Sequence, residues 1–209
     1  MAQLAISAKR NDVALQHLHF ATTLAPNHAG MQLSFGCLLA HANQLKAAIA
    51  PLSAASKLAP NLPDAWYFLG ITYDKLGRDI EALEALAKAY NLGENNPRIL
   101  AAYADIQFRS GFPDDALPLL ERLAKANPDN LDAQLKLAET YSRLGQHAQA
   151  RNVCETALKG QKDIADIWMA LAQIHEDEGN REAAEHAYEQ ALQQRPNWAF
   201  PQAGLLGLL

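Results

Sequence analysis

The chain has little of several things that would assign it to a particular class of protein. Only two of its 209 residues are cysteines, Cys37 and Cys154, without CxxC spacing, so we expect neither a disulfide framework nor a cysteine zinc site. Apolar runs are only a few residues long, far below the roughly 20 residues that cross a bilayer. The N-terminus also lacks the apolar stretch of a signal peptide. These absences predict a cytoplasmic protein with no membrane segment.

Neither sign of charge dominates the chain. A net charge of −5 argues against a general nucleic-acid binder, and 49% hydrophobic residues argue against disorder. The charge is nevertheless uneven: residues 1–62 carry four basic and one acidic residue, whereas residues 165–198 carry two basic and seven acidic residues. Such a gradient can orient an extended ligand, although ordinary charge on a solvated face would give the same imbalance.

Signatures of catalysis and of nucleotide binding are missing as well. The sequence contains no GxGxxG, GxxxxGK[ST], GxSxG or HExxH motif, and the nearest approach to HExxH, residues 175–179, ends in glycine. We therefore expect a chain that is not an enzyme and that has no catalytic residue, no cofactor and no metal ion.

What the chain does have is an internal period of 34 residues. Glycines recur at this spacing at Gly77, Gly111, Gly145 and Gly179. Prolines recur with the same period at four places, with Glu94 and Lys162 at the two missing ones. Alanine fills all six equivalent positions, which are Ala14, Ala48, Ala82, Ala116, Ala150 and Ala184. A fixed period of this length indicates a repeat architecture.

Each period predicts two antiparallel helices. In residues 63–96 the spacing i, i+3, i+4, i+7 gives the first helix one apolar face, and Pro63 suits its first turn. Gly77 suits the left-handed conformation that ends a helix. A small residue occupies one position of every first helix, which lets the two helices cross closely; these residues are Gly36, Gly70, Ala104, Ala138 and Ala172.

The pattern W-x-x-L-G-x-x-Y at Trp66, Leu69, Gly70 and Tyr73, followed by Gly77, Ala82 and Ala89, resembles the tetratricopeptide repeat. The tryptophan position departs from it in three repeats, which hold Gln32, Leu100 and Gln134. The resemblance implies an all-α, right-handed α-solenoid of antiparallel helix pairs, with residues 1–209 as a single array. The full repeats are 29–62, 63–96, 97–130, 131–164 and 165–198.

Both ends are expected to be incomplete. The period places a turn at Lys9, so residues 1–7 would be the tail of a first helix and a second helix would run near Leu15 and Leu18. Residues 199–209 would begin a further helix with almost no polar face. We expect self-association through this C-terminal apolar segment, whose large side chains are Trp198, Phe200, Leu205, Leu206, Leu208 and Leu209. The alternative is that the segment folds back on the preceding repeat.

The resemblance also implies a concave groove lined by positions two, five, nine, twelve and thirteen of the first helices. In repeat 165–198 these positions are mostly acidic: Asp166, Met169, Gln173, Glu176 and Asp177. The lysines and asparagines with which chaperone-binding members hold a terminal carboxylate are not present. Our candidates for peptide contact are Tyr67, Ile71, Lys75, Asp105, Phe108, Arg109, Glu139 and Arg143. Phe108 follows Gln107, which holds the tyrosine position, so its side chain can equally point into the core.

These features predict a non-catalytic scaffold that binds a peptide or protein segment in its groove. One alternative is that the chain is the N-terminal repeat region of a larger enzyme, of glycosyltransferase or sulfotransferase type, cut off before its catalytic domain. The apolar ending at residues 204–209 motivates that alternative, because repeat arrays usually close with a polar capping helix. A purely structural self-assembly element is a further alternative.

Overall fold

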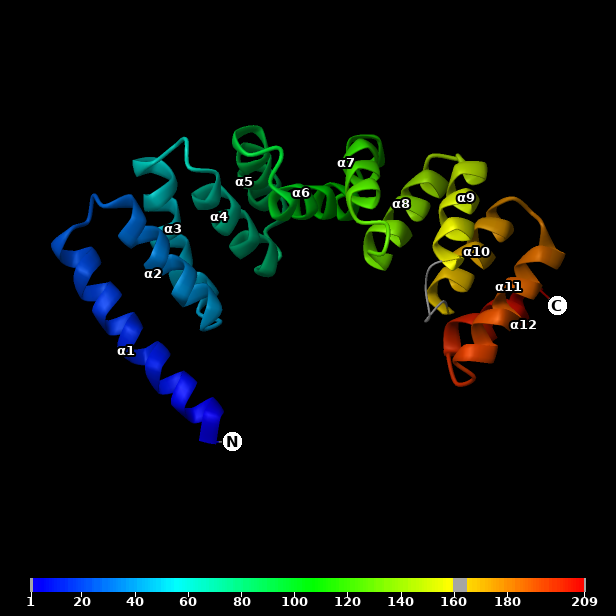
Figure 1. Cartoon of the computed structure of the whole chain (residues 1–209), viewed down its shortest axis with the longest axis horizontal. Helices are drawn as coiled ribbons and strands as arrows, with labels where there is room; N and C mark the ends of the chain where they lie inside the picture. Colours follow the sequence, from blue (N-terminus) through cyan, green and yellow to red (C-terminus); the bar gives the residue numbers. More distant parts are fainter. Residues whose placement is uncertain (1, 160–164, 209) are drawn as a thin grey trace. The chain divides into compact units, whose positions relative to one another are not determined.

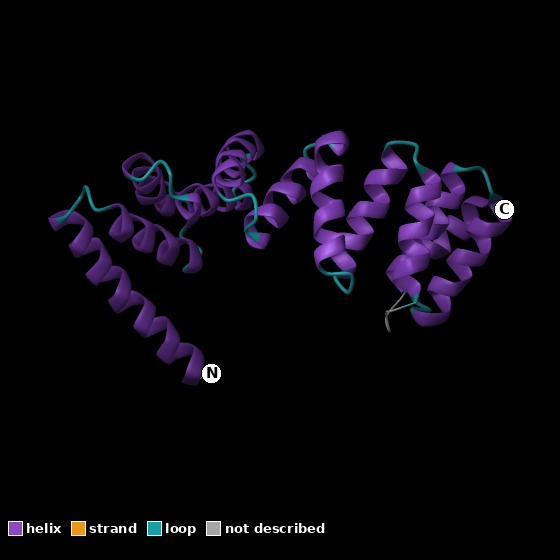
Figure 2. Cartoon of the chain, turned by 45° about the horizontal axis from the view of Figure 1, so that its top comes forward, coloured by secondary structure: helices purple, strands orange, loops and turns teal. Residues whose placement is uncertain are grey.

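The computed structural model describes residues 2–159 and 165–208, with side chains from Asp12 onward. Every regular element in this part of the chain is a helix, as Figure 2 shows in purple. The helices are α1 (Ala2–Leu24), α2 (Ala29–His41), α3 (Leu45–Leu58), α4 (Pro63–Lys75), α5 (Asp79–Leu92), α6 (Pro97–Arg109), α7 (Pro113–Ala126), α8 (Leu131–Arg143), α9 (His147–Leu158), α10 (Ala165–Asp177), α11 (Arg181–Gln194) and α12 (Ala199–Leu208). The all-α helical-repeat fold of solenoid type is therefore confirmed.

The helices belong to two compact units, residues 1–106 and residues 107–209. Within the first unit, α1 packs against α2, α2 against α3, α3 against α4, and α4 against α5 (Figure 1). Within the second unit, α7 packs against α8, and the packing continues in chain order to α12. The boundary falls inside α6, within repeat 97–130, where the 34-residue period gives no sign of a division.

The turns adopt the conformations that the period predicts. Gly77 has φ +69°, and the three equivalent glycines have φ between +71° and +79°. Asn43 occupies the same place in the first full repeat with φ +59°. At the turn after α4, the amide of Gly77 donates to Asp74 O at 2.9 Å and that of Arg78 to Tyr73 O at 3.0 Å. The left-handed residue thus satisfies carbonyls that the end of the helix would otherwise leave unpaired.

The small residues mark close helix crossings. A Cβ added to Gly36 in α2 would lie 2.5 Å from Cγ of Leu52 in α3. A Cβ added to Gly70 in α4 would lie 2.7 Å from Cγ of Leu86 in α5. Both leucines are completely buried, or nearly so. At these two crossings the facing leucine therefore occupies the space that a methyl group on the glycine would need.

The tryptophan position has a hydrogen-bonding role. The indole Nε1 of Trp66 donates to the carbonyl of Pro60 at 2.9 Å. Glutamine side chains at the equivalent position donate to the equivalent proline carbonyls, from Gln32 to Pro26 at 3.0 Å and from Gln134 to Pro128 at 3.3 Å. A glutamine here preserves the contact that an indole makes, so these departures from the motif keep its structure.

The N-terminal expectation was wrong. Residues 2–24 form one continuous helix, and no turn interrupts it at Lys9. A non-glycine residue in the left-handed region costs about 1–2 kcal/mol, whereas continuing the helix pairs its backbone groups internally. Leu15 of α1 packs against the core of the first unit, while Phe20 and Leu24 are exposed.

Part of the C-terminal segment folds back on the preceding repeat, which was the alternative expectation, and part of it is exposed. Leu205 and Leu208 of α12 pack against the core of the second unit, and Pro201 is buried. Phe200 and Leu206 remain 71% and 72% exposed. Leu209 lies outside the described residues. None of the helices in the described part of the chain combines the length and apolarity that a membrane span requires.

Candidate interaction surface

A cleft of about 230 Å³ lies in the first unit beside the first helices of two successive repeats, α2 and α4. Three of our candidates, Tyr67, Ile71 and Lys75, line it together. The remaining lining residues are Cys37, Ala40, His41, Phe68, Thr72 and Arg98. Positions nine, twelve and thirteen of repeat 29–62 therefore face positions five, nine and thirteen of repeat 63–96, the arrangement that the resemblance implies. We name this cleft the N-terminal cleft.

The N-terminal cleft combines aromatic, apolar and cationic groups. The guanidinium of Arg98 lies 5.1 Å from the ring centre of Tyr67 and 5.6 Å from that of Phe68, within the range of cation–π attraction. Burial, and secondly the negative charge of Asp64, raise the pKa of the Cys37 thiol to about 11, against a smaller opposing effect of Arg98. The thiol is therefore neutral near pH 7 and is not activated as a nucleophile.

A larger cleft of about 550 Å³ lies in the second unit between α8 and α10. We name it the C-terminal cleft. Two further candidates, Glu139 and Arg143, line it. Its other lining residues are Leu135, Ser142, Asp166, Met169, Ala170, Gln173, Ile174, Glu176, Asp177 and Trp198. Trp198 is the final residue of the last full repeat, and no periodic signal in the sequence placed it here.

Arg143 is held by three contacts within its own unit. Its guanidinium forms an ion pair with Glu139 at 2.6 Å and donates to the carbonyl of Phe108 at 3.3 Å. The same group lies 4.4 Å from the ring centre of Phe108. Arg143 is thus a fixed part of the cleft wall.

A second ion pair within this unit involves Asp166, in the first turn of α10. Arg195 donates through both terminal nitrogens to the two carboxylate oxygens of Asp166, each at 2.9 Å. Its guanidinium also lies 5.1 Å from the ring centre of Trp198. This bidentate pair fixes both charges in a defined geometry, with Trp198 beside it.

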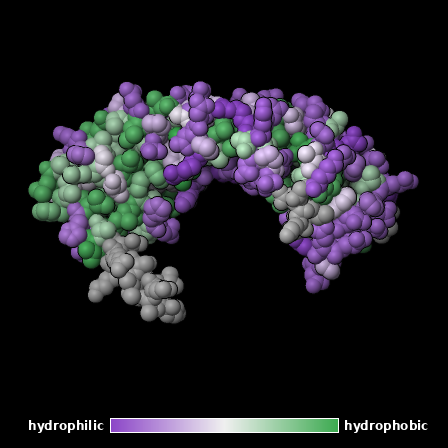
Figure 3. Space-filling model, in the orientation of Figure 1, coloured by the Kyte–Doolittle hydropathy of each residue, from purple (hydrophilic) through white to green (hydrophobic). Residues whose placement is uncertain are grey.

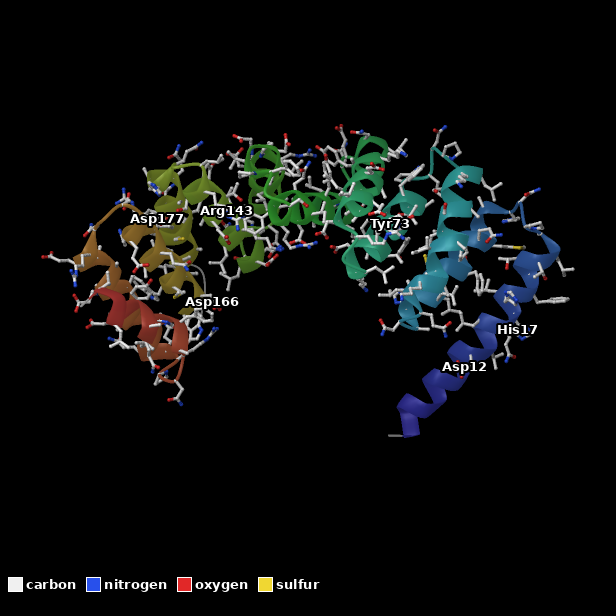
Figure 4. All side chains as sticks on the ribbon, turned by 180° about the vertical axis from the view of Figure 1, so that it is seen from behind. Asp12, His17, Tyr73, Arg143, Asp166 and Asp177 are labelled. Carbon is white, nitrogen blue, oxygen red and sulfur yellow. The ribbon has the colours of Figure 1, made fainter. Side chains whose placement is uncertain are left out.

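Glu176 and Asp177, the last two residues of α10, each accept a hydrogen bond from a hydroxyl group. Glu176 accepts a hydrogen bond from the hydroxyl of Tyr188 at 2.7 Å, and Asp177 accepts one from the hydroxyl of Ser142 at 2.8 Å. Burial and the hydrogen bond to Glu176 raise the pKa of Tyr188, so it stays a neutral donor. Figure 4 shows Arg143 and Asp177 near one another, with Asp166 farther along α10.

The three candidates on α6 line neither cleft. Asp105 is half-buried and Arg109 is exposed. Phe108 is only 8% exposed, so the expectation that it contacts a peptide is corrected and the alternative, a core side chain, is what the structure shows. The guanidinium of Arg143 lies over the Phe108 ring, 4.4 Å from the ring centre, and the neighbouring Gln107 is buried as well.

The described residues include no group of three or more His, Cys, Asp or Glu side chains that are placed to hold a metal ion. The second cysteine, Cys154, is buried in the core of the second unit. Burial is the main cause that raises its pKa to about 12. Both cysteines are free thiols, and their surroundings suppress the ionisation of each, as expected of packing residues.

The surfaces of the two units differ in polarity. In Figure 3, hydrophobic residues are frequent over α1 to α4, whereas hydrophilic residues predominate over the last helices. This difference follows the uneven charge of the sequence, with seven acidic residues in repeat 165–198.

Comparison with known protein families gives three matches over nearly the whole chain. Models described as tetratricopeptide repeat match residues 1–129, 107–174 and 165–198. Among curated proteins, Superkiller protein 3 of Schizosaccharomyces pombe is 30% identical over 118 residues. That match covers 56% of this chain and 8% of the relative, so the chain spans a small part of that protein's length.

Solved structures share the fold at low sequence identity. YrrB, a TPR protein with an unusual peptide-binding site, has a TM-score of 0.82 at 21% identity, over 89% of this chain and 96% of YrrB. The MamA protein has a TM-score of 0.73 at 22% identity, over 82% of this chain and 93% of MamA. The structure of the APC/C hetero-tetramer Cut9–Hcn1 has a TM-score of 0.64 at 19% identity, over 98% of this chain and 41% of the matched chain.

Proposed function

Since the chain belongs to the tetratricopeptide repeat family, we propose that it is a non-catalytic scaffold that binds peptide or protein segments in the clefts along its first helices. The observation that carries this proposal is the composition of the two clefts. Each combines an apolar or aromatic surface with a few fixed charged groups, which is the usual make-up of a binding site. The peptide-binding site of YrrB, which shares this fold, supports the same proposal. A cytoplasmic location is part of it.

Within the N-terminal cleft, Tyr67 is the residue whose loss we expect to weaken binding most. Aromatic side chains and arginine carry a large share of interface energy, and Arg98 already holds the Tyr67 ring in place. Ile71 and Lys75 extend the same surface. Arg109 and Asp105 stay candidates on α6, outside both clefts.

Selection from a library of random 12-residue peptides displayed on phage, with the immobilised full chain as bait, tests the proposal. We expect peptides to be enriched over a blank surface, and at least one class to lose about tenfold or more in affinity on Tyr67→Ala. Phe112→Ala is the matched control, because Phe112 is an exposed aromatic outside both clefts. The absence of any enriched peptide would contradict the proposal, as would enriched peptides indifferent to changes in both clefts.

The exposed side chains of α12 support a second contact, with another copy of the chain. Phe200 and Leu206 expose apolar surface next to residues that pack against the core. Burying that surface between two copies would remove it from water. We therefore propose weak self-association through this helix.

A further inference from the structure

The C-terminal cleft has an apolar floor and a rim of negative charge. Leu135, Met169, Ile174 and Trp198 contribute the apolar part of the lining. Four carboxylates stand around it, on Glu139, Asp166, Glu176 and Asp177. The cleft volume of about 550 Å³ lies within the range of sites that bind a compact ligand or a few side chains.

The four carboxylates are not equivalent. Glu139 is paired with Arg143, and Asp166 is paired with Arg195. Glu176 and Asp177 accept hydrogen bonds from the neutral hydroxyls of Tyr188 and Ser142, and no described cation forms an ion pair with either. The two hydroxyls orient these carboxylates without neutralising them.

Two uncompensated charges beside an apolar floor determine which segment complements the cleft. An acidic segment would be repelled, and a purely apolar one would leave both carboxylates without a counter-charge while it displaced their water. A lysine or arginine pairs with them, and an adjacent large apolar side chain covers the floor.

We propose that the C-terminal cleft binds an extended protein segment in which a lysine or arginine stands beside a large apolar residue. The cation pairs with Glu176 and Asp177, and the apolar side chain lies against Met169 and Trp198. This inference rests on the proposed scaffold function and adds the chemistry of its partner. The N-terminal cleft provides an internal contrast, because the fully charged side chains in its lining, Lys75 and Arg98, are positive.

The peptides enriched on the full chain test this inference. We expect one class to carry a lysine or arginine beside Leu, Ile, Met, Phe or Trp. A fluorescein-labelled synthetic peptide of that class should bind the Glu176→Gln, Asp177→Asn double variant about 4- to 25-fold more weakly, as loss of two partly exposed ion pairs implies. Both substitutions keep an oxygen that accepts the hydroxyl hydrogen bond, so they remove charge with little effect on the fold.

The matched control is Glu185→Gln with Glu189→Gln. Both residues are exposed in α11 of the same repeat, outside the cleft lining, and the net charge changes by the same amount. Binding to this variant should stay within about twofold of the wild type. Met169→Ala should weaken binding about three- to tenfold through loss of apolar contact, and it should leave the preference for basic peptides intact.

The possible failures are distinguishable. Enriched peptides that depend on Tyr67 but include no basic class would overturn this inference and leave the scaffold function standing. A basic class whose affinity is the same for the cleft variant and its control would overturn it too, because the attraction would then come from the general charge of the repeat. If no peptide were enriched, the scaffold function and the inference would fail together.

Discussion

Gly70 in α4 faces Leu86 in α5 so closely that one added methyl group should destabilise the first unit. In Gly70→Ala the new Cβ would lie 2.7 Å from Cγ, 3.0 Å from Cδ2 and 3.2 Å from the backbone nitrogen of Leu86. Overpacking of this kind costs about 1–3 kcal/mol. Alanine recovers about 1 kcal/mol over glycine in a helix interior. We expect a net loss of about 1 kcal/mol, and at most about 2 kcal/mol.

An equivalent pair of residues in the second unit suggests a background in which Gly70→Ala would no longer lower the free energy of unfolding. The equivalent pair in repeat 131–164 is Ala138 and Cys154, and both are buried in one core cluster. In a Leu86→Cys background the side chain that meets the new Cβ is smaller, so Gly70→Ala should become neutral or stabilising by up to about 1 kcal/mol. The coupling free energy between the two positions should therefore be about 1–3 kcal/mol.

Urea unfolding of the full chain, followed by far-UV circular dichroism and by tryptophan fluorescence, measures these differences. Gly207→Ala is the control, because no heavy atom outside its immediate neighbours lies within 4 Å of the added Cβ. It should be neutral or slightly stabilising. If Gly70→Ala stabilises as Gly207→Ala does, or changes stability equally in both backgrounds, the close crossing does not explain the glycine.

Three further predictions concern the core, a thiol and the last helix. Ala116 is completely buried, so Ala116→Leu should lower the free energy of unfolding by about 1–3 kcal/mol. Lys125→Ala, at an exposed site, should change it by less than about 0.5 kcal/mol. Equal effects of the two substitutions in urea unfolding would contradict this prediction. The pKa of Cys37 is raised to about 11, so at pH 8 iodoacetamide should modify this thiol about tenfold more slowly than it modifies free cysteine. The rate should increase as the pH rises toward 11, and mass spectrometry of the modified thiol measures it. Phe200→Ser with Leu206→Ser should reduce any concentration-dependent self-association seen by light scattering after chromatography; a strictly monomeric wild-type chain would refute that proposal.

The turns and crossings could be predicted from the sequence because each depends on one or two residues. A left-handed φ is open to glycine at little cost, so the spacing of Gly77 and its equivalents located the turns that the structure has. The crossings were indicated by residue volume alone, as at Gly36. The turns and the crossings recur with the period because each repeat needs the same turn conformation and the same close approach of its two helices.

The clefts could be predicted less completely. The positions carried over from the family brought Tyr67, Ile71 and Lys75 to one cleft, because helical periodicity determines which positions share a face. Which charged side chains pair with one another could not be predicted from the sequence. Arg143 contacts Phe108, which lies 35 residues earlier, and a residue pair so far apart in sequence has no local signal.

The tryptophan position shows what a repeat motif conserves physically. Trp66 and the glutamines at its equivalents all donate to the carbonyl six residues earlier, and in each of these cases that carbonyl belongs to proline. Repeat 97–130 has neither partner, because Leu100 cannot donate and Glu94 replaces the proline. There the side chain of Asn96 accepts from the amide of Arg98 at 3.0 Å and caps the start of α6, as the side chains of Asn130 and His28 cap α8 and α2 in repeats that keep the proline contact. Where the proline carbonyl accepts such a bond, the donor is an indole in one repeat and a glutamine amide in the others, so in those repeats the position is constrained by a backbone hydrogen bond rather than by the identity of an aromatic residue.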